Sequence, residues 1–205
     1  MNLPNMLTAS RIVASPVLFG LFFLPSLFGV PYTVVVPLLW VLFLVMEVTD
    51  VLDGWVARRT GTVTDLGKVL DPYSDVISRI TYFVAFTALG IMYPIFLLLI
   101  VYREVSILFV RMLMYRDGIA LAARKGGKLK AVFYNISGVI GLVIFSVEGL
   151  DLFAASPQVY NGLRISAVII FALATLLSWT SFLDYLQVFR KSRRERTNDG
   201  SQKKV

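Results

Sequence analysis

Residues 49–75 read TDVLDGWVARRTGTVTDLGKVLDPYSD and place Asp50, Asp53, Asp71 and Asp75 between two strongly apolar runs. A single charged side chain at the centre of a lipid-spanning helix costs about 3 kcal/mol on translocon-based scales. Four carboxylates so close together therefore need neutralising partners. We interpret this stretch as the centre around which the rest of the chain is organised.

The composition around this stretch is that of an integral membrane protein. Of the 205 residues, 57% are hydrophobic, and the mean hydropathy is +0.75. A soluble domain of this length is usually less apolar. Apolar runs of lipid-spanning length recur along nearly the whole chain, so we expect one membrane domain and no large soluble one.

The sequence contains no histidine and no cysteine. This absence excludes Ser-His-Asp and Cys-His catalysis and any zinc site ligated by histidine or cysteine. A general base in this protein must therefore be a carboxylate, a lysine or a tyrosine. A metal site must be built from oxygen ligands.

The hydrophobic pattern predicts an all-α integral membrane protein with six transmembrane helices and a short N-terminal interfacial helix at residues 1–10. The predicted spans are residues 12–28, 32–46, 69–89, 95–114, 131–147 and 163–189. The second span continues as a polar helix as far as Arg58, and Thr64 or Asp65 is suited to cap the third. Residues 1–190 form the expected membrane domain. Residues 191–205 form a basic cytoplasmic tail, disordered or helical only at its start.

The distribution of Lys and Arg predicts how the chain is oriented. The connectors near residues 30 and 91 and between 149 and 162 contain no Lys or Arg, whereas segments 58–68 and 116–130 and the tail contain many. The positive-inside rule then places both termini and the acidic stretch on the cytoplasmic side of a bacterial-type plasma membrane. Arg164 is an exception. The basic tail suits anionic lipid headgroups better than nucleic acid, because such tails are common in membrane proteins.

The aspartates have helical spacing. Asp50 and Asp53 are three residues apart and Asp71 and Asp75 four apart, so each pair shares one helix face. Two antiparallel helices can thus direct all four carboxylates into one space, where their mutual repulsion requires cations. Oxygen ligands suit Mg²⁺ or Mn²⁺, and four carboxylates suit two ions. The alternative is a set of ordinary salt bridges with the nearby cations Arg58, Arg59, Lys68 and Arg79.

The spacing also matches a known motif. Asp50-x2-Asp53-Gly54-x2-Ala57-Arg58-x8-Gly67-x3-Asp71-x3-Asp75 agrees without a gap with the motif of the CDP-alcohol phosphotransferase family, at eight positions. On these residues the chain is identified as a member of that family, whose six-helix membrane core would cover nearly all of it. The resemblance implies that Asp50, Asp53 and Asp71 bind two divalent cations, Mg²⁺ or Mn²⁺. It implies that Asp75 contributes to this centre and acts as the general base.

The resemblance also implies the substrates. The donor would be CDP-diacylglycerol, whose phosphatidyl group passes to an alcohol with CMP as the leaving group. The residues expected to contact or frame the donor are Asn5, Thr8, Gly54, Arg58, Thr64 and Gly67. The family further implies a homodimer.

Two further segments indicate the acceptor. The opening NLPNMLTASR and the basic residues between positions 103 and 130 are similar to phosphatidylglycerophosphate synthases. This similarity implies glycerol 3-phosphate as acceptor and phosphatidylglycerophosphate, a phospholipid precursor, as product. The residues expected to bind the acceptor phosphate are Arg103, Arg111, Lys128 and Lys130, although the two lysines fit plain positive-inside residues equally well.

One position departs from that pattern. These synthases often carry Lys directly after the last motif aspartate, and this chain has Val76. Inositol phosphate, serine and choline therefore stay open as acceptors. Two other classes stay open as well: a cation channel or transporter that uses the aspartates as its ion site, and a membrane anchor whose basic tail recruits a partner.

Overall fold

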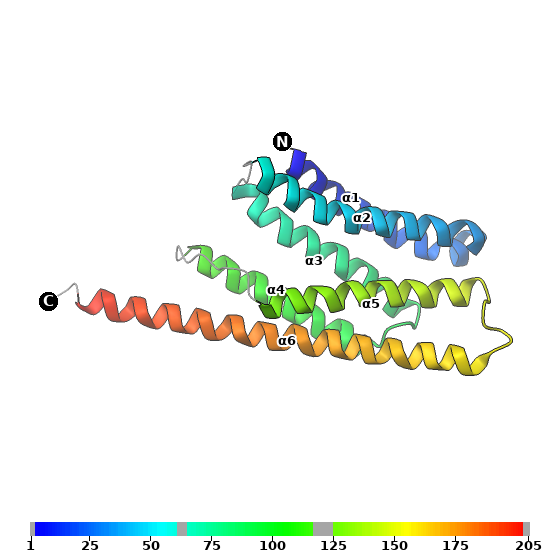
Figure 1. The fold of residues 1–205 in the computed structure, drawn as a ribbon. Coiled ribbons are helices and arrows are strands. Elements are labelled where there is room, and N and C mark those ends of the chain that lie inside the picture. Colours follow the sequence, from blue (N-terminus) through cyan, green and yellow to red (C-terminus); the bar gives the residue numbers. More distant parts are fainter. Residues whose placement is uncertain (1–2, 61–64, 117–124, 203–205) are drawn as a thin grey trace.

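The computed structural model describes residues 3–60, 65–116 and 125–202, and these residues form six helices and no strand. The helices are α1 Leu3–Phe28, α2 Tyr32–Thr60, α3 Asp65–Ala88, α4 Pro94–Arg116, α5 Lys125–Gly149 and α6 Pro157–Gln202. They form an elongated bundle (Figure 1). The predicted all-α class is confirmed for the described residues.

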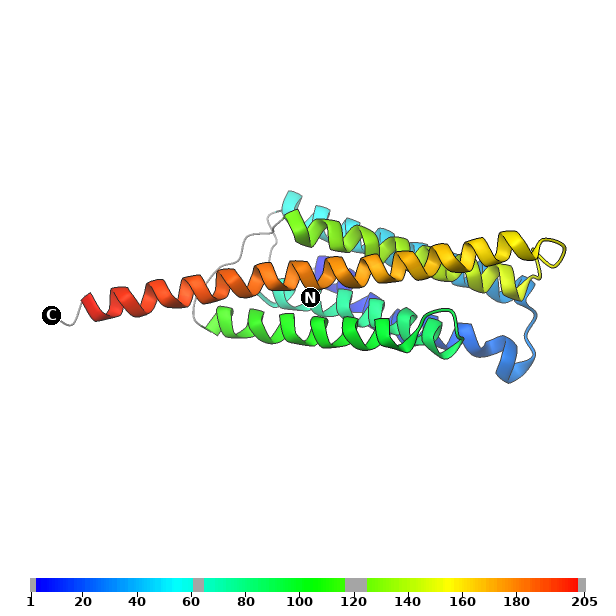
Figure 2. The same cartoon turned by 90° about the horizontal axis from the view of Figure 1, so that it is seen from below.

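The bundle consists of two packed groups of helices. In the first, α1 packs against α2 and α3, and in the second, α6 packs against α4 and α5. Contacts of α3 with α4 and α5, and of α2 with α5, join the groups. The chain's two ends lie toward the same end of the bundle, and the α1–α2 and α5–α6 connections lie at the opposite end (Figure 1). The last turns of α6 extend beyond the other helices (Figure 2).

Among the described residues, four helices are long and apolar enough to cross a membrane. The segments are Asn5–Phe28, Tyr32–Asp50, Leu129–Gly149 and Pro157–Arg190. These helices indicate an integral membrane protein. The helices α3 and α4 do not qualify, because charged side chains interrupt both, and their role as spans stays a prediction. The interrupting residues are Asp71, Asp75 and Arg79 in α3, and Arg103, Glu104 and Arg111 in α4.

The ends of the chain differ from the prediction. The expected short helix at residues 1–10 is not a separate element, because α1 runs without a break from Leu3 to Phe28. The polar side chains of Asn5 and Thr8 are buried, so they pack inside the bundle and mark no boundary between two helices. The tail is also more helical than predicted, since α6 continues to Gln202. Its Arg, Lys, Glu and Gln residues are good helix formers and no proline interrupts them.

Helices α3 and α5 pack closely against each other. A Cβ atom on Gly141 of α5 would lie only 2.2 Å from Cε2 of Phe86 on α3, so glycine permits this approach.

At the end of α3, Gly90 adopts a left-handed φ of 71°. The N–H groups of Gly90 and Ile91 donate to the carbonyls of Thr87 and Phe86, which is a Schellman ending that turns the chain into α4.

Candidate active site

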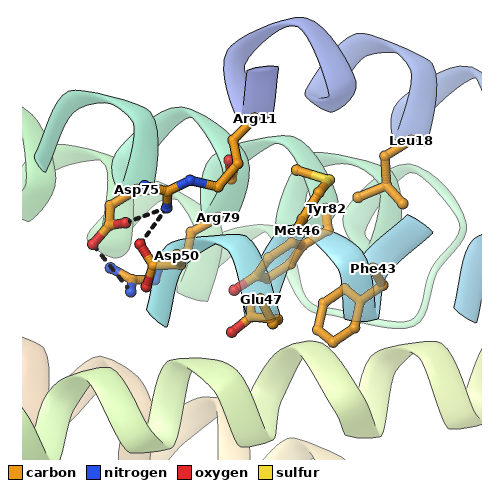
Figure 3. Close-up of a pocket in the computed structure, with 10 residues that line it drawn as sticks. Arg11, Leu18, Phe43, Met46, Glu47, Asp50, Asp75, Arg79 and Tyr82 are labelled. Carbon is orange, nitrogen blue, oxygen red and sulfur yellow. Dashed lines mark hydrogen bonds and ion pairs between the residues drawn. The ribbon is translucent and has the colours of Figure 1, made fainter. Parts of the chain in front are cut away.

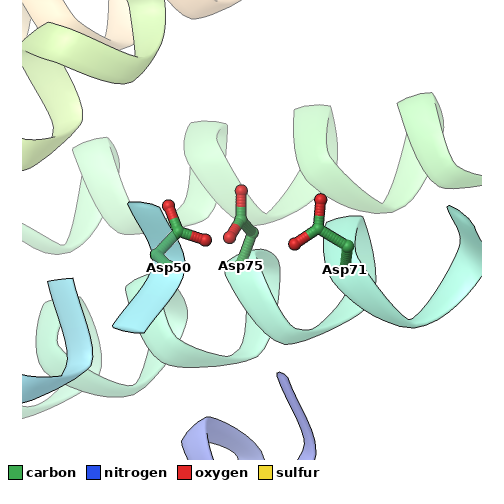
Figure 4. A group of neighbouring side chains, drawn as sticks. All are labelled: Asp50, Asp71 and Asp75. Carbon is green, nitrogen blue, oxygen red and sulfur yellow. The ribbon is translucent and has the colours of Figure 1, made fainter. Parts of the chain in front are cut away.

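Three of the motif aspartates lie together in a row (Figure 4). Asp50 comes from α2, and Asp71 and Asp75 come from successive turns of α3. One carboxylate oxygen from each lies within 4.8 Å of the other two. Asp71 is the most open of the three, with 53% of its side chain exposed, so the row is accessible at that end.

A cation from a third helix lies among these carboxylates. Arg11 on α1 is only 3% exposed, and it forms ion pairs with all three aspartates. Its Nη1 donates to Oδ1 of Asp50 and, at 2.9 Å, to Oδ1 of Asp75, as Figure 3 shows. Its Nη2 donates to Oδ1 of Asp71 at 3.2 Å. Helix α1 is thereby tied to both helices that carry the motif.

Arg11 is a site residue that the sequence motif does not include. A signal was present, because Arg11 is the first Lys or Arg of the chain and stands at the start of a long apolar run. A cation in such a run needs a carboxylate partner. Which carboxylates it would reach depends on how α1 packs, and helix periodicity within one segment carries no information about that packing.

The aspartate row fits a divalent metal ion. Its ligand atoms are all carboxylate oxygens, which Mg²⁺ and Mn²⁺ prefer. The Arg11 guanidinium demonstrates that these oxygens converge on one positive charge. Asp53 follows Asp50 on α2, but its side chain lies outside the described part of the structure, as do the side chain of Arg58 and the surroundings of Gly54.

Arg79 holds the opposite side of Asp75. Its Nη2 lies 3.4 Å from Oδ2 of Asp75, one helical turn away on α3. The two oxygens of Asp75 therefore face different cations, Oδ1 toward Arg11 and Oδ2 toward Arg79. A cavity of about 20 Å³ adjoins the pair and is lined in part by Glu47, Asp50 and Tyr82. This volume suits a water molecule and no larger ligand.

A larger cavity shares Asp75 and Arg79 with the first. Its volume is about 140 Å³, and it lies between α3, α4, α5 and α6. The charged residues in its wall are Asp75, Arg79, Arg103, Glu104, Arg111 and Lys130. Val76 and Ile107 are among its apolar lining residues.

Glu104 organises the cations of this larger cavity. It is only 3% exposed, and its Oε1 accepts from Lys130 Nζ and, at 2.9 Å, from Arg103 Nη1. Arg103 Nε also donates to the carbonyl of Ser178 on α6 at 3.0 Å. The Lys130 ammonium lies 4.7 Å from the centre of the Tyr134 ring. One carboxylate thus fixes two cations and links α4, α5 and α6.

Arg111 and Lys128 are the other two residues expected to bind the acceptor phosphate. Arg111 is exposed, yet it lines the same cavity and its guanidinium carbon lies 5.7 Å from the centre of the Tyr185 ring. Lys128 belongs to α5, but its side chain lies outside the described residues. The structure therefore brings Arg103, Arg111 and Lys130 to one cavity.

The residues expected at the donor are only partly described. Asn5 and Thr8 are buried on α1. The Thr8 carbonyl accepts a hydrogen bond of 3.1 Å from the hydroxyl of Ser74, the residue before Asp75. Gly67 lies in the first turn of α3 and is partly exposed. Thr64 lies outside the described residues.

Together these features form an anion-handling site between helices. A row of carboxylates suited to divalent cations adjoins a cavity lined by four cationic side chains. Cations and guanidinium groups are the partners that phosphate groups require. An all-α membrane bundle with this arrangement has the features expected of a membrane enzyme that acts on phosphate esters.

Comparison with known proteins narrows this class to a family. A family model described as CDP-alcohol phosphatidyltransferase matches residues 1–183. The chain therefore belongs to the CDP-alcohol phosphatidyltransferase family. It is a phosphatidyltransferase of phospholipid biosynthesis, and the family resemblance stated from the motif is confirmed.

Individual relatives have the same kind of description. A CDP-diacylglycerol–glycerol-3-phosphate 3-phosphatidyltransferase of Treponema pallidum is 37% identical over 152 residues, covering 72% of this chain and 68% of that protein. A probable phosphatidylglycerophosphate synthase of Mycobacterium tuberculosis is 30% identical over 187 residues, covering 90% of this chain and 80% of that protein. A CDP-diacylglycerol–glycerol-3-phosphate 3-phosphatidyltransferase of Aquifex aeolicus is 26% identical over 188 residues, covering 90% and 94%.

Proposed function

We propose that this enzyme transfers the phosphatidyl group of CDP-diacylglycerol to the hydroxyl of glycerol 3-phosphate, giving phosphatidylglycerophosphate and CMP. The observation that carries the proposal is the cavity of about 140 Å³, which four cationic side chains line immediately beside Asp75. The names of the relatives support the same acceptor.

The charge of the cavity favours an acceptor that carries phosphate. Arg79, Arg103, Arg111 and Lys130 outnumber Asp75 and Glu104 by two positive charges in its wall. A phosphate monoester carries about −1.5 to −2 charges at neutral pH and so matches this excess. Choline is a cation and serine has no net charge, so neither gains from it. Inositol phosphate has the same charge as glycerol 3-phosphate, but it is bulkier.

The donor would bind at the aspartate row. Asp50, Asp53, Asp71 and Asp75 would hold two divalent cations, Mg²⁺ or Mn²⁺, which when bound would neutralise the diphosphate of CDP-diacylglycerol. The residues proposed to contact or frame its nucleotide are Asn5, Thr8, Gly54, Arg58, Thr64 and Gly67. The exposed end of the row at Asp71 supports this placement, because a lipid-linked nucleotide needs an open approach.

Asp75 would act as the general base of the transfer. The acceptor oxygen forms a bond to the phosphorus on the diacylglycerol side, and the bond between that phosphorus and the bridging oxygen breaks. CMP leaves with the bridging oxygen and its electron pair, and the acceptor proton passes to Asp75. Asp75 belongs to the aspartate row and also lines the larger cavity, which supports this role, since the proton would be released where the two substrates meet.

Placement in the cell forms part of the same proposal. Both termini and the active site face the cytoplasm, in a bacterial-type plasma membrane, and residues 191–205 extend there as a basic tail. The positive-inside distribution and the shared end of the two termini support this orientation (Figure 1). The enzyme would act as a homodimer surrounded by membrane lipids.

The test is CMP release by the purified protein from CDP-diacylglycerol. Glycerol 3-phosphate, inositol 1-phosphate, inositol, serine and choline are compared as acceptors, each with Mg²⁺, with Mn²⁺ and with a chelator. We expect release with glycerol 3-phosphate and a divalent ion, and none with the chelator. Turnover with an unphosphorylated alcohol alone would refute the acceptor assignment. Metal-dependent ion flux without CMP release would identify a transporter instead.

A further inference from the structure

Arg79 is a cation of the site for which the sequence motif and the relatives' names provide no role. It lines both cavities, the small one beside the aspartate row and the large cationic one. Only 13% of its side chain is exposed. A guanidinium in such a position needs partners on every side, and these partners indicate what it does.

The known contacts of Arg79 leave part of its charge directed at the large cavity. Its ion pair with Asp75 is long, at 3.4 Å, and uses Nη2. Its guanidinium carbon lies 5.8 Å from the centre of the Tyr134 ring, in the range of a cation–π contact. The ring supports the guanidinium from one face without removing its capacity to donate hydrogen bonds in its plane.

The other cations of the large cavity do not pair with Asp75 among the described ion pairs. Arg103 and Lys130 share the carboxylate of Glu104, and Arg111 lies at the exposed margin beside Tyr185. On α3 itself, the buried Val76 contributes an apolar wall one turn before Arg79. The positive charge nearest to Asp75 within this cavity wall therefore comes from Arg79, through the ion pair that joins them.

We infer that Arg79 is a specificity-determining residue, which binds the phosphate group of the acceptor and so holds the acceptor's hydroxyl beside Asp75. The inference rests on the proposed function, because it requires an acceptor that carries phosphate. A guanidinium can contact Asp75 and an acceptor phosphate at the same time, since its five N–H donors form a planar fork. The acceptor hydroxyl is then held near the carboxylate that takes its proton.

The experiment measures steady-state kinetics of Arg79→Met and Arg79→Lys with both substrates varied. In Arg79→Met we expect the KM for glycerol 3-phosphate to rise roughly 10- to 100-fold, the loss of one charge-assisted hydrogen bond, while the KM for CDP-diacylglycerol stays within about two-fold. Arg79→Lys keeps the charge without the fork and should lie between wild type and Arg79→Met.

A binding measurement separates this role from a purely structural one. With CDP and Mn²⁺ present, which cannot complete the reaction, glycerol 3-phosphate should raise the Tm of the wild type but not that of Arg79→Met. The Tm increase caused by CDP and Mn²⁺ should persist in both. Arg164→Met is the matched control, because Arg164 pairs with Glu148 and Gly90 at the other end of the bundle. This control should keep both responses.

The outcomes distinguish the two proposals. If wild type is active with glycerol 3-phosphate and Arg79→Met has an unchanged acceptor KM, the inference about Arg79 is wrong and the proposed function stands. A lower kcat with neither KM affected would likewise show that Arg79 only supports the fold or Asp75. If wild type releases no CMP with glycerol 3-phosphate, the proposed function itself fails. Should Arg79→Met not fold, the intermediate KM of Arg79→Lys still decides.

Discussion

The aspartate row and the cationic cavity use opposite arrangements of the same groups. In the row, three carboxylates, Asp50, Asp71 and Asp75, surround one guanidinium, that of Arg11. In the cavity, two cations, Arg103 and Lys130, surround one carboxylate, that of Glu104. The first region has an excess of negative charge and the second an excess of positive charge. The Asp75–Arg79 pair stands between them and belongs to both.

This difference indicates what the ion pairs are for. Buried ion pairs contribute little net stability, because removing each charge from water offsets most of their attraction. Two regions with opposite excess charge are therefore better explained by recognition. The acidic region suits cations and the basic region suits an anion, and we propose that the chemistry takes place where they meet. Three substitutions test this comparison, in order of decreasing expected effect.

Asp75→Asn should have the largest effect, because it removes the carboxylate that borders both regions. We expect kcat to fall at least about a thousand-fold, since the proposed general base and a proposed metal-binding oxygen are lost together. The measurement is CMP release at saturating substrates. Asp151→Asn is the matched control, because Asp151 is exposed in the turn after α5 at φ 52°, a conformation that Asn also tolerates. Residual activity above about a tenth of wild type would remove Asp75 from the mechanism.

Arg11→Met should destabilise the acidic region strongly. It leaves three carboxylates facing one another without the guanidinium that now joins them, and breaking a buried ion pair from one side costs about 3–5 kcal/mol. We expect a lower Tm in a chelator, measured as the loss of monodisperse protein after heating in detergent. Mg²⁺ or Mn²⁺ should restore more stability to this variant than to wild type.

Arg164→Met provides the control for Arg11→Met, because it removes an arginine from a partly exposed pair at the far end of the bundle. Its Tm should change little and should not gain an added dependence on divalent ions. An Arg11→Met variant as stable as wild type in chelator would contradict the view that Arg11 neutralises the row.

Glu104→Gln should have the smallest effect of the three. The amide oxygen can still accept hydrogen bonds from Arg103 and Lys130, so we expect a loss of only about 1–3 kcal/mol in stability. The excess positive charge of the cavity increases, and the KM for glycerol 3-phosphate should therefore fall a few-fold. Glu148→Gln makes the same chemical change at the far end and should leave this KM unchanged. A ten-fold rise in KM for Glu104→Gln would show that Glu104 must be charged to position the cations.

Much of the site could be predicted because helix periodicity is a local property. The four-residue spacing of Asp71 and Asp75 places both on one face of α3, and the preceding helix brings Asp50 to them. The second substrate site was predicted from the resemblance to a subfamily and not from periodicity, and Arg103, Arg111 and Lys130 do reach one cavity. The roles assigned to these residues stay predictions.

Contacts between helices distant in sequence could not be predicted. Arg11 is 39 residues from Asp50 and 64 from Asp75, and pairs with them only because α1 packs against α2 and α3. Arg79 was considered only as a salt-bridge partner, since nothing in its spacing reveals that two cavities meet at its side chain. Polar residues also led to wrong helix bounds at both ends of the chain. The buried Asn5 and Thr8 lie within one continuous α1, and the charged tail extends α6.

By itself, the sequence determined that this is a helical membrane protein with a row of carboxylates at helical spacing, because hydrophobicity and periodicity are properties of neighbouring residues. The tertiary structure alone decided which cations those carboxylates meet and where the acidic and basic regions touch. Such pairs depend on how α1, α3, α4, α5 and α6 pack against one another. Close contacts between helices, such as that of Gly141 with Phe86, are part of this packing.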